Sequence, residues 1–386
     1  MPHFLDNQIV LIYFLISIIL LMLSIVSIFY HSNKLDNINF IFTSIVMVCF
    51  YGLRYPGTTD AKMYLANFDG LSNFASFQWG GGFYALMKSI SFIDKSHDSY
   101  IFFSSAFFVI LLAIFAFTVF RNSYYKSLFM IVCYLNWDIF ELVANAYRQG
   151  IAVVLSSLAC ILLYRKRFIL SLSLYALAIT FHWGVFIVIV ASVGGIFIMR
   201  KKILLPLTKI TLLLFGIVIF IKIDIMSIVY NYASALSFLF SNVDLSSKAD
   251  AYLAGGVTGA NFYEFELVRR IYNIGTMIMP LLFLTAYLNN KERGNIFFAD
   301  KQNVLIATQF ILLIFYGVFL ISMTWFMRNF YWNSIFSCAI FIIIIQSLQK
   351  SQSKYFNKIL AIFSIYILLF SLLTFWRTPS IFLSYP

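Results

Sequence analysis

The sequence carries little charge. Only 11% of its 386 residues are Asp, Glu, Lys or Arg, whereas soluble domains carry about 25%. With 62% hydrophobic residues, the chain is not a water-soluble domain. Among the charged residues, acidic ones are the fewer: 15 Asp and Glu stand against 27 Lys and Arg, which leaves a net charge of +12. In a membrane protein, short basic loops facing anionic lipid explain such an excess. We therefore expect membrane lipid as a partner, and no nucleic acid.

The sequence also lacks the short motifs of several enzyme classes. It contains no glycine-rich nucleotide loop, no metalloprotease or nucleophile-elbow motif, and no metal-ligand spacing. Its four cysteines lie singly inside apolar runs and form no Cys-x-x-Cys pair, which argues against a zinc site. We expect no cofactor and no metal. No linker, internal repeat or low-complexity tract divides the chain, so residues 1–386 are predicted to form a single membrane domain.

Long apolar runs dominate the chain. A bilayer-spanning helix needs about 20 apolar residues. The runs predict an all-α, polytopic membrane protein with about twelve transmembrane helices. They cover residues 8–30, 37–53, 100–120, 127–143, 146–164, 168–182, 183–199, 203–223, 267–288, 302–322, 332–348 and 358–376. The fourth and sixth runs are short.

The loops predict the orientation of these helices. Most Lys and Arg fall on one side, together with only three acids, Asp36, Glu292 and Asp300. That side is therefore predicted to be cytoplasmic. Both termini and two enlarged loops, 54–99 and 224–266, are then predicted to lie outside. Each loop contains an apolar stretch too short to span, 82–93 and 225–240, which fits a re-entrant or interfacial helix.

Six arginines lie on the predicted outer side, where positive charge is normally sparse. They are Arg54, Arg148, Arg269, Arg270, Arg328 and Arg377. Cations next to hydrocarbon usually hold an anion. The pattern predicts an outer-face site for a lipid-linked phosphate or pyrophosphate.

Two of these arginines lie in polar segments at helix ends. Arg54, Asp60 and Tyr64 follow the second run, where an ordinary helix exit with a Pro-Gly turn is the alternative. Arg148 and Gln149 open the fifth run, where an ion pair between Glu141 and Arg148 is the alternative. Ionisable groups at membrane depth are functional candidates by default.

The segment His182-Trp183-Gly184 separates two apolar runs. The 14 residues before His182 span about 21 Å as a helix, less than the ~30 Å hydrocarbon core. We expect His182 to lie recessed in the outer leaflet. Its titration range suits a general base, although a histidine that closes a hairpin is an equal alternative.

The remaining outer arginines have local explanations as well. Arg269 and Arg270 stand three and four residues after Glu266, the spacing of helical ion pairs. Arg328 lies in a turn rich in aromatic residues, which an interfacial belt explains without explaining the arginine.

Five segments together resemble the EpsG-like branch of Wzy-type polysaccharide polymerases, which are bacterial inner-membrane proteins. They are GLRYPGTTDAKMY (52–64), GGFYALMK (81–88), AYRQGIA (146–152), ITFHWG (179–184) and, more weakly, MRNFYW (327–332). They occur in that family's order and spread over most of the chain.

The resemblance implies an activity and an outer site. Such proteins join oligosaccharide repeat units carried on undecaprenyl pyrophosphate, on the outer or periplasmic face. They are similar to O-antigen ligases and to GT-C glycosyltransferases. The resemblance implies metal-independent, inverting transfer, with arginines on the pyrophosphate and a base on the acceptor hydroxyl. The donor and acceptor are both lipid-linked oligosaccharides, and a chain-length regulator is left open as a further partner.

The motifs carry these roles onto particular residues. Arg54 and Asp60 match the first motif, Arg148 and Gln149 the second, His182 the third, and Arg328 a looser fourth. Arg269, Arg270 and Arg377 rest on charge alone. Tyr64, Trp79, Phe83 and Tyr84 either offer faces for sugar rings or simply pack, and Trp183 is a further substrate-binding candidate. His182 is expected to be the base or to hydrogen-bond to it, and Asp60 is the next candidate.

Four other functions stay open from the sequence. An O-antigen ligase or a transferase of single polyprenyl-phosphate sugars would not lengthen its product in repeat-unit steps. A lipid flippase or transporter would usually show repeats and charges near the bilayer midplane, and a membrane acyltransferase is a further class.

Overall fold

The computed structural model describes residues 4–54, 59–71, 77, 79–199, 203–222, 262–323 and 326–377. Within these ranges every regular element is a helix, as the apolar runs predict. The side chains of 4–10, 59, 276, 291–292 and 373–377 lie outside the description. Most of the predicted loop 224–266, including the apolar stretch 225–240, also lies outside it.

The chain divides into two compact units. The first comprises Met1–Val190 and Ile342–Pro386, and the second Ala191–Phe341. The described helices of the first unit are α1 (Phe4–Phe29), α2 (Asn33–Gly52), α3 (Thr59–Asp69), α4 (Gly81–Ile93), α5 (His97–Phe120), α6 (Lys126–Tyr134), α7 (Trp137–Ala144), α8 (Tyr147–Tyr164), α9 (Phe168–Phe181) and α19 (Phe356–Arg377). Those of the second are α11 (Leu204–Phe220), η3 (Phe262–Glu264), α14 (Leu267–Asn289), α15 (Lys291–Ala299), α16 (Lys301–Phe319), α17 (Phe326–Phe330) and η4 (Tyr331–Asn333). Helices α10 (Val185–Met199) and α18 (Ser334–Lys350) each run from one unit into the other.

All twelve predicted apolar runs coincide with helices, but not all of those helices are long. Six are long and apolar enough to cross a membrane in the described residues, or eight if two bent pairs each count as one span. Four runs form shorter apolar helices, which begin at Phe168, Val185, Leu204 and Phe356. The chain is therefore a polytopic helical membrane protein, and twelve crossings remain a prediction.

The predicted helix 127–143 is wrong as a single helix. It is broken into α6 and α7, which meet at 70°. Asn136 ends the break by accepting hydrogen bonds from the backbone N–H groups of Asp138 (2.8 Å) and Ile139 (3.2 Å). Tyr13 and Tyr51 donate to the carbonyl oxygen of Tyr134 at 2.9 and 3.3 Å. These partners satisfy the backbone groups that a break at membrane depth sets free.

Helix α14 is also bent, by 65°, between Gly275 and Met277. Pro280 lies four residues after the break. A proline ring clashes with the carbonyl of the fourth residue before it and cannot donate to that group. The bend therefore follows from the proline.

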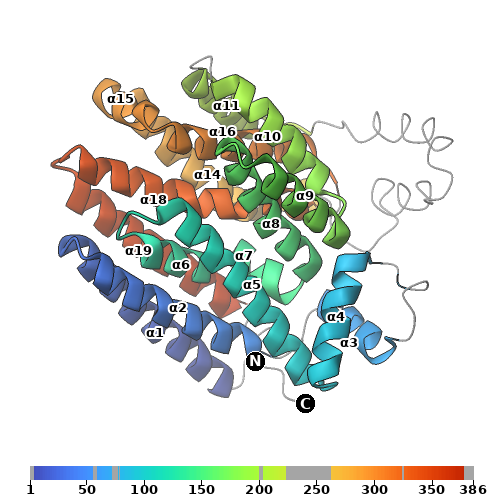
Figure 1. Ribbon diagram of the computed structural model, residues 1–386. Helices are drawn as coiled ribbons and strands as arrows, with labels where there is room; N and C mark the ends of the chain where they lie inside the picture. Colours follow the sequence, from blue (N-terminus) through green and yellow to red (C-terminus); the bar gives the residue numbers. More distant parts are fainter. Residues whose placement is uncertain are drawn as a thin grey trace, which may run out of the picture. The chain divides into compact units, whose positions relative to one another are not determined.

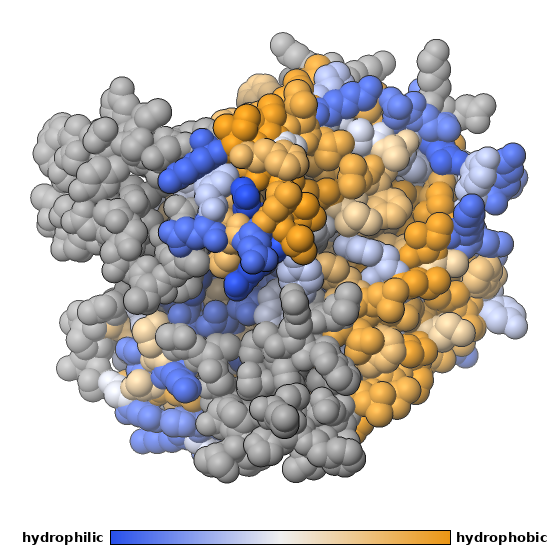
Figure 2. All heavy atoms as spheres, turned by 180° about the vertical axis from the view of Figure 1, so that it is seen from behind, coloured by the Kyte–Doolittle hydropathy of each residue, from blue (hydrophilic) through white to orange (hydrophobic). Residues whose placement is uncertain are grey.

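Apolar side chains cover much of the described surface, as expected for contact with lipid. Figure 2 shows broad hydrophobic areas on one face. Large side chains project from several helices, among them Ile169 of α9, which is 85% exposed, and Val190 of α10, which is 72% exposed. Helix α8 is the buried counterpart, because most of its side chains from Gln149 to Ile161 are enclosed.

Two short helices lie at one end of the first unit, where α5 begins (Figure 1). Helix α4 packs against α9 and α5, and α3 packs against α5. Phe83 and Met87 anchor α4, since neither has any exposed surface. The predicted apolar stretch 82–93 is therefore a helix whose inner side is buried against the bundle.

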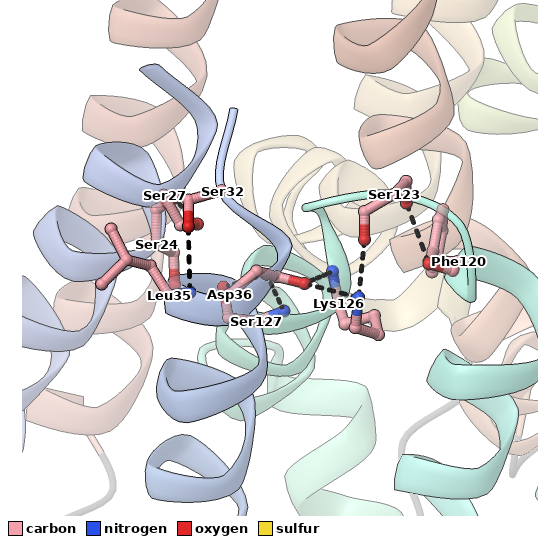
Figure 3. A network of polar contacts seen from close by, with 9 residues as sticks. All are labelled: Ser24, Ser27, Ser32, Leu35, Asp36, Phe120, Ser123, Lys126 and Ser127. Atoms are coloured by element: carbon pink, nitrogen blue, oxygen red, sulfur yellow. Dashed lines mark hydrogen bonds and ion pairs between the residues drawn. The ribbon is translucent and has the colours of Figure 1, made fainter. Parts of the chain in front are cut away.

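A buried ion pair joins α2 to α6 (Figure 3). The Nζ of Lys126 lies 2.9 Å from Oδ2 of Asp36, and their side chains are 2% and 0% exposed. The Asp36 carboxylate also accepts from the N–H groups of Lys126 and Ser127 and from the Ser127 hydroxyl. Lys126 donates in addition to the carbonyl of Ser123 at 2.6 Å. The carboxylate thus caps the N-terminus of α6, where a negative charge is favourable.

Replacing Lys126 with Met is expected to lower the stability strongly, because Asp36 would remain buried without its cation. Such a loss typically costs about 3–5 kcal/mol. Adding Asp36→Asn should recover part of it, since an amide oxygen still accepts from the N-terminus of α6. The check is the melting temperature of the detergent-solubilised protein, with the exposed Lys209→Met of α11 as control. Equal melting of Lys126→Met and the control would contradict the assignment.

Candidate functional site

The hairpin between α7 and α8 is the centre of the candidate site in the first unit. Gly150 lies so close to the end of α7 that a Cβ there would stand 2.4 Å from the carbonyl oxygen of Leu142. Tyr147 donates to the carbonyl of Ser104 at 2.7 Å, which ties the start of α8 to α5. Only glycine, which has no Cβ, permits the close approach of residue 150 to the Leu142 carbonyl.

Arg148 projects from the first turn of α8 into a group of aromatic rings. Its Nη1 donates to the carbonyl oxygen of Trp79 at 3.1 Å. Its guanidinium carbon lies 5.1 Å from the centre of the Trp79 ring and 6.0 Å from that of Phe83. Its Nε is buried and has no hydrogen-bond partner among the described residues.

The predicted alternative for Arg148, an ion pair with Glu141, is not formed. The Glu141 carboxylate accepts from the Asn145 side chain at 3.2 Å. In the part of the chain that the structure describes, no carboxylate lies within ion-pair distance of Arg148. Gln149, the next residue, is 5% exposed. The Arg148 cation is therefore solvated by aromatic faces and one carbonyl, an arrangement worth about 0.5–2 kcal/mol per ring.

Helix α3 brings Asp60 and Tyr64 to the same hairpin. The backbone N–H of Asp60 donates to the side-chain oxygen of Asn145 at 3.3 Å. One turn later, the buried ring of Tyr64 packs edge-to-face on Trp79 and Phe83, with ring centres 5.1 and 5.2 Å away. Asp60, Tyr64 and Arg148 are thus assembled around Trp79 and Asn145.

The start of α4 lies directly against the end of α9. Gly80 has a φ of +92°, and a Cβ there would stand 2.3 Å from the Thr180 carbonyl oxygen. A Cβ at Gly82 would stand 2.2 Å from Oγ1 of Thr180 and 2.8 Å from the Phe181 ring. Because His182 follows Phe181, the contact places the Trp79 turn beside the His182 turn.

His182 ends α9 and is half-buried. Its Nδ1 accepts a hydrogen bond from the backbone N–H of Gly184 at 3.0 Å. In the neutral imidazole the proton is then on Nε2, so that this nitrogen is a donor and not an acceptor. Trp183 is 73% exposed, and its ring lies nearly parallel to that of His182, at 12°.

Arg54 has different surroundings from Arg148. It is 9% exposed and donates to the carbonyl oxygens of Tyr51 and Val143 and to the Ser105 hydroxyl. Burial lowers its pKa to about 10, so it is still cationic at neutral pH. Arg54 thus links α2 and α7 through their backbone carbonyls and α5 through the Ser105 hydroxyl.

In the second unit, Arg270 lies at the C-terminus of α11. Its Nη1 donates to the carbonyl of Ile219 at 2.6 Å, a group that the helix itself leaves unsatisfied. Its guanidinium carbon lies 6.0 and 5.9 Å from the rings of Phe262 and Tyr263. Its Nε, like that of Arg148, is buried without a partner among the described residues.

Arg269 is exposed and lies 4.3 Å from the centre of the Phe265 ring. The predicted ion pairs with Glu266 are absent from the described contacts of both arginines. Glu266 caps α14, and Arg270 bonds to it through the backbone.

Arg328 is half-buried in the short helix α17. Phe330, the last residue of α17, fixes that helix: its ring stacks on Phe215 of α11 at 5.9 Å and fills the space left by Gly317 of α16. Arg377 closes α19, and its side chain lies outside the described residues, as do Tyr55–Thr58 of the first motif.

Sequence reasoning assigned no role to Asn145, Gly80 or Thr180. Asn145 lay within the polar segment before Arg148, but its link to α3 joins residues far apart in the chain. The three consecutive glycines 80–82 were the available signal, since such a run often marks close backbone approach. No group of three or more His, Cys, Asp or Glu suited to a metal occurs in the described residues.

Comparison with known proteins gives one match. The model of the EpsG family matches residues 37–385, which is most of the chain. No curated protein and no solved structure matches it.

Proposed function

The chain belongs to the EpsG family, and from that premise we propose that it polymerises oligosaccharide repeat units carried on undecaprenyl pyrophosphate. The family indicates a membrane polysaccharide polymerase, and the apolar helices agree with it. The donor, the outer-face location in a bacterial inner membrane and the residue roles below are parts of the proposal. Its product would be an O-antigen, a capsule or an exopolysaccharide.

The proposed reaction is an inverting glycosyl transfer. A hydroxyl oxygen of the acceptor sugar attacks the anomeric carbon of the donor and forms the new glycosidic bond. The bond from that carbon to the pyrophosphate oxygen breaks, and undecaprenyl pyrophosphate leaves with the electron pair. The hydroxyl proton passes to a base on the protein. The chemistry therefore requires cations at the leaving group and a base near the acceptor.

The surroundings of Arg148 give the proposal its main support. Among the described residues, no carboxylate lies within ion-pair distance of its guanidinium, and its buried Nε has no hydrogen-bond partner. Leaving such a donor unsatisfied costs about 1–3 kcal/mol or more. A phosphate oxygen bound there would supply the missing acceptor, and the planar guanidinium suits phosphate. We propose Arg148 as the main contact to the pyrophosphate.

We propose different roles for the other arginines. Arg54 is engaged by three protein acceptors, so we propose that it supports the hairpin and adds positive potential. Arg269, Arg270 and Arg328 belong to the second unit, and we propose that they bind phosphate within that unit. Of these three, Arg270 resembles Arg148 most, because it also donates to a backbone carbonyl and has a buried Nε without a partner among the described residues.

Aromatic side chains and Gln149 are proposed to contact the sugars. Trp183 presents most of its ring, and a ring face suits the C–H groups of a pyranose. Tyr64 is packed under Trp79 and Phe83, so its contribution would be to hold those rings.

Of the two catalytic candidates, we propose that Asp60 accepts the proton and that His182 donates a hydrogen bond. Asp60 is half-buried beside the Arg148 hairpin, and its carboxylate is the proposed base. A base role for His182 would need a lone pair on Nε2, but the bond from Gly184 favours a proton there. We therefore propose a different role from the expected base or base partner: His182 donates from Nε2 to a substrate oxygen.

Arg148→Ala is expected to lower turnover by about 10²–10³-fold, the usual effect of removing a group that stabilises transition-state charge. Arg148→Lys should recover little, because an ammonium group cannot replace the planar fork. The check is polymer formed per mole of folded protein. Arg165→Ala is the matched control, since Arg165 caps the other end of α8 and also donates to a backbone carbonyl. Full turnover in Arg148→Ala would show that the residue only packs.

His182→Ala is expected to lose about 10–100-fold in turnover, the contribution of a hydrogen bond to a charged group. His182→Gln should stay much closer to wild type, because its amide accepts from Gly184 and still donates. A base role predicts that both variants lose 10²–10⁴-fold, about the range of general-base catalysis. Turnover per mole of folded protein separates the two roles, with the exposed His31→Gln as control.

A further inference from the structure

Helix α3 begins with a backbone donor that its own helix cannot satisfy. The first N–H groups of any helix lack an intrahelical acceptor. The N–H of Asp60, in the first turn of α3, donates to Oδ1 of Asn145 on the α7–α8 hairpin. Asn145 therefore acts as an N-cap supplied from another part of the chain, in the role that Asn usually plays within its own helix.

A second hydrogen bond fixes the orientation of the Asn145 amide. Its Nδ2 donates to Oε2 of Glu141 at 3.2 Å, and its backbone N–H donates to the carbonyl of Glu141 at 2.9 Å. A flipped amide would face an N–H with its NH₂ group and a carboxylate with its oxygen. The order Glu141, Asn145, Asp60 is thus set by donor and acceptor type.

The other contacts of α3 hold its later turns. Tyr64 packs on Trp79 and Phe83, and Phe68 packs on Tyr100 with ring centres 5.0 Å apart. The bond to Asn145 reaches the first turn, which carries the Asp60 carboxylate. Because Asn145 stands three residues before Arg148, one turn of chain holds both the candidate base and the candidate phosphate contact.

We propose that Asn145 is a positioning residue, held by Glu141, that sets the Asp60 carboxylate relative to Arg148. The proposal rests on the proposed function, in which Asp60 accepts the proton of the acceptor hydroxyl. Asn145 touches neither the sugar nor the pyrophosphate in this account. Its effect is on the alignment of the base.

An exchange of donor and acceptor tests the proposal. Asn145→Asp places a second carboxylate against Glu141, so their repulsion should break the link and shift α3. A misplacement of about 1 Å can cost on the order of 10²-fold in rate, so we expect a loss of that size in kcat with little change in KM. Glu141→Gln alone should be nearly neutral, because its amide oxygen still accepts from Asn145.

The double variant is the decisive member of the series. With Asn145→Asp and Glu141→Gln together, the new amide donates to the new carboxylate, which again accepts from the N–H of Asp60. We expect kcat to return to near the wild-type value. Unchanged kcat in Asn145→Asp, or no recovery in the double variant, would overturn the proposal.

Hydrogen exchange gives a readout that does not depend on activity. The peptide containing residues 59–65 should exchange faster in Asn145→Asp and regain protection in the double variant. If the wild-type protein does not polymerise, the proposed function fails, while exchange still tests the link between Asn145 and α3. Altered exchange with unaltered kcat would leave Asn145 a structural cap and overturn its positioning role.

Discussion

The first unit depends on one constraint: a backbone that breaks at membrane depth must find its hydrogen-bond partners within the protein. The chain breaks twice in 12 residues, between α6 and α7 and again between α7 and α8. Tyr13 and Tyr51 satisfy the carbonyl at the first break, and Arg54 satisfies that of Val143 near the second. These partners come from α1 and from the end of α2. The short helices are held in place by these bonds, and the polar turn before α8 becomes rigid.

The arginines that the sequence predicts to lie on the outer side have different surroundings. Arg54 donates to two carbonyls and a hydroxyl, and so stabilises the broken backbone itself. Arg148 gives one donor to Trp79 and keeps its Nε without a described partner. Arg270 likewise donates to a carbonyl at the end of α11 and has an Nε without a described partner. A cation held over aromatic rings with an unmet donor is prepared for an anion, whereas a cation enclosed by carbonyls is not.

Much of the helical content could be predicted from the sequence, because the signal is local. Each apolar run is helical, although run 127–143 forms two helices, and Arg148 and His182 lie at helix ends as predicted. The break before Asn136 was missed, since the apolar run continues through it and the compensating tyrosines lie far away in the chain. The buried ion pair of Asp36 and Lys126 was missed as well, because these two residues lie far apart in the chain. The contacts of Gly80 with Thr180 and of Asn145 with Asp60 are tertiary, and neither spacing nor composition encodes them.

The most direct test of the account uses the purified protein and undecaprenyl-pyrophosphate-linked repeat units in excess EDTA. Arginine side chains need no added metal to stabilise the departing pyrophosphate, so a ladder of products spaced by one repeat unit is expected. A strict requirement for Mg²⁺ or Mn²⁺ would contradict the arginine-based site and favour a metal held by Asp60. Transfer of a single unit without further growth would contradict the assignment as a polymerase.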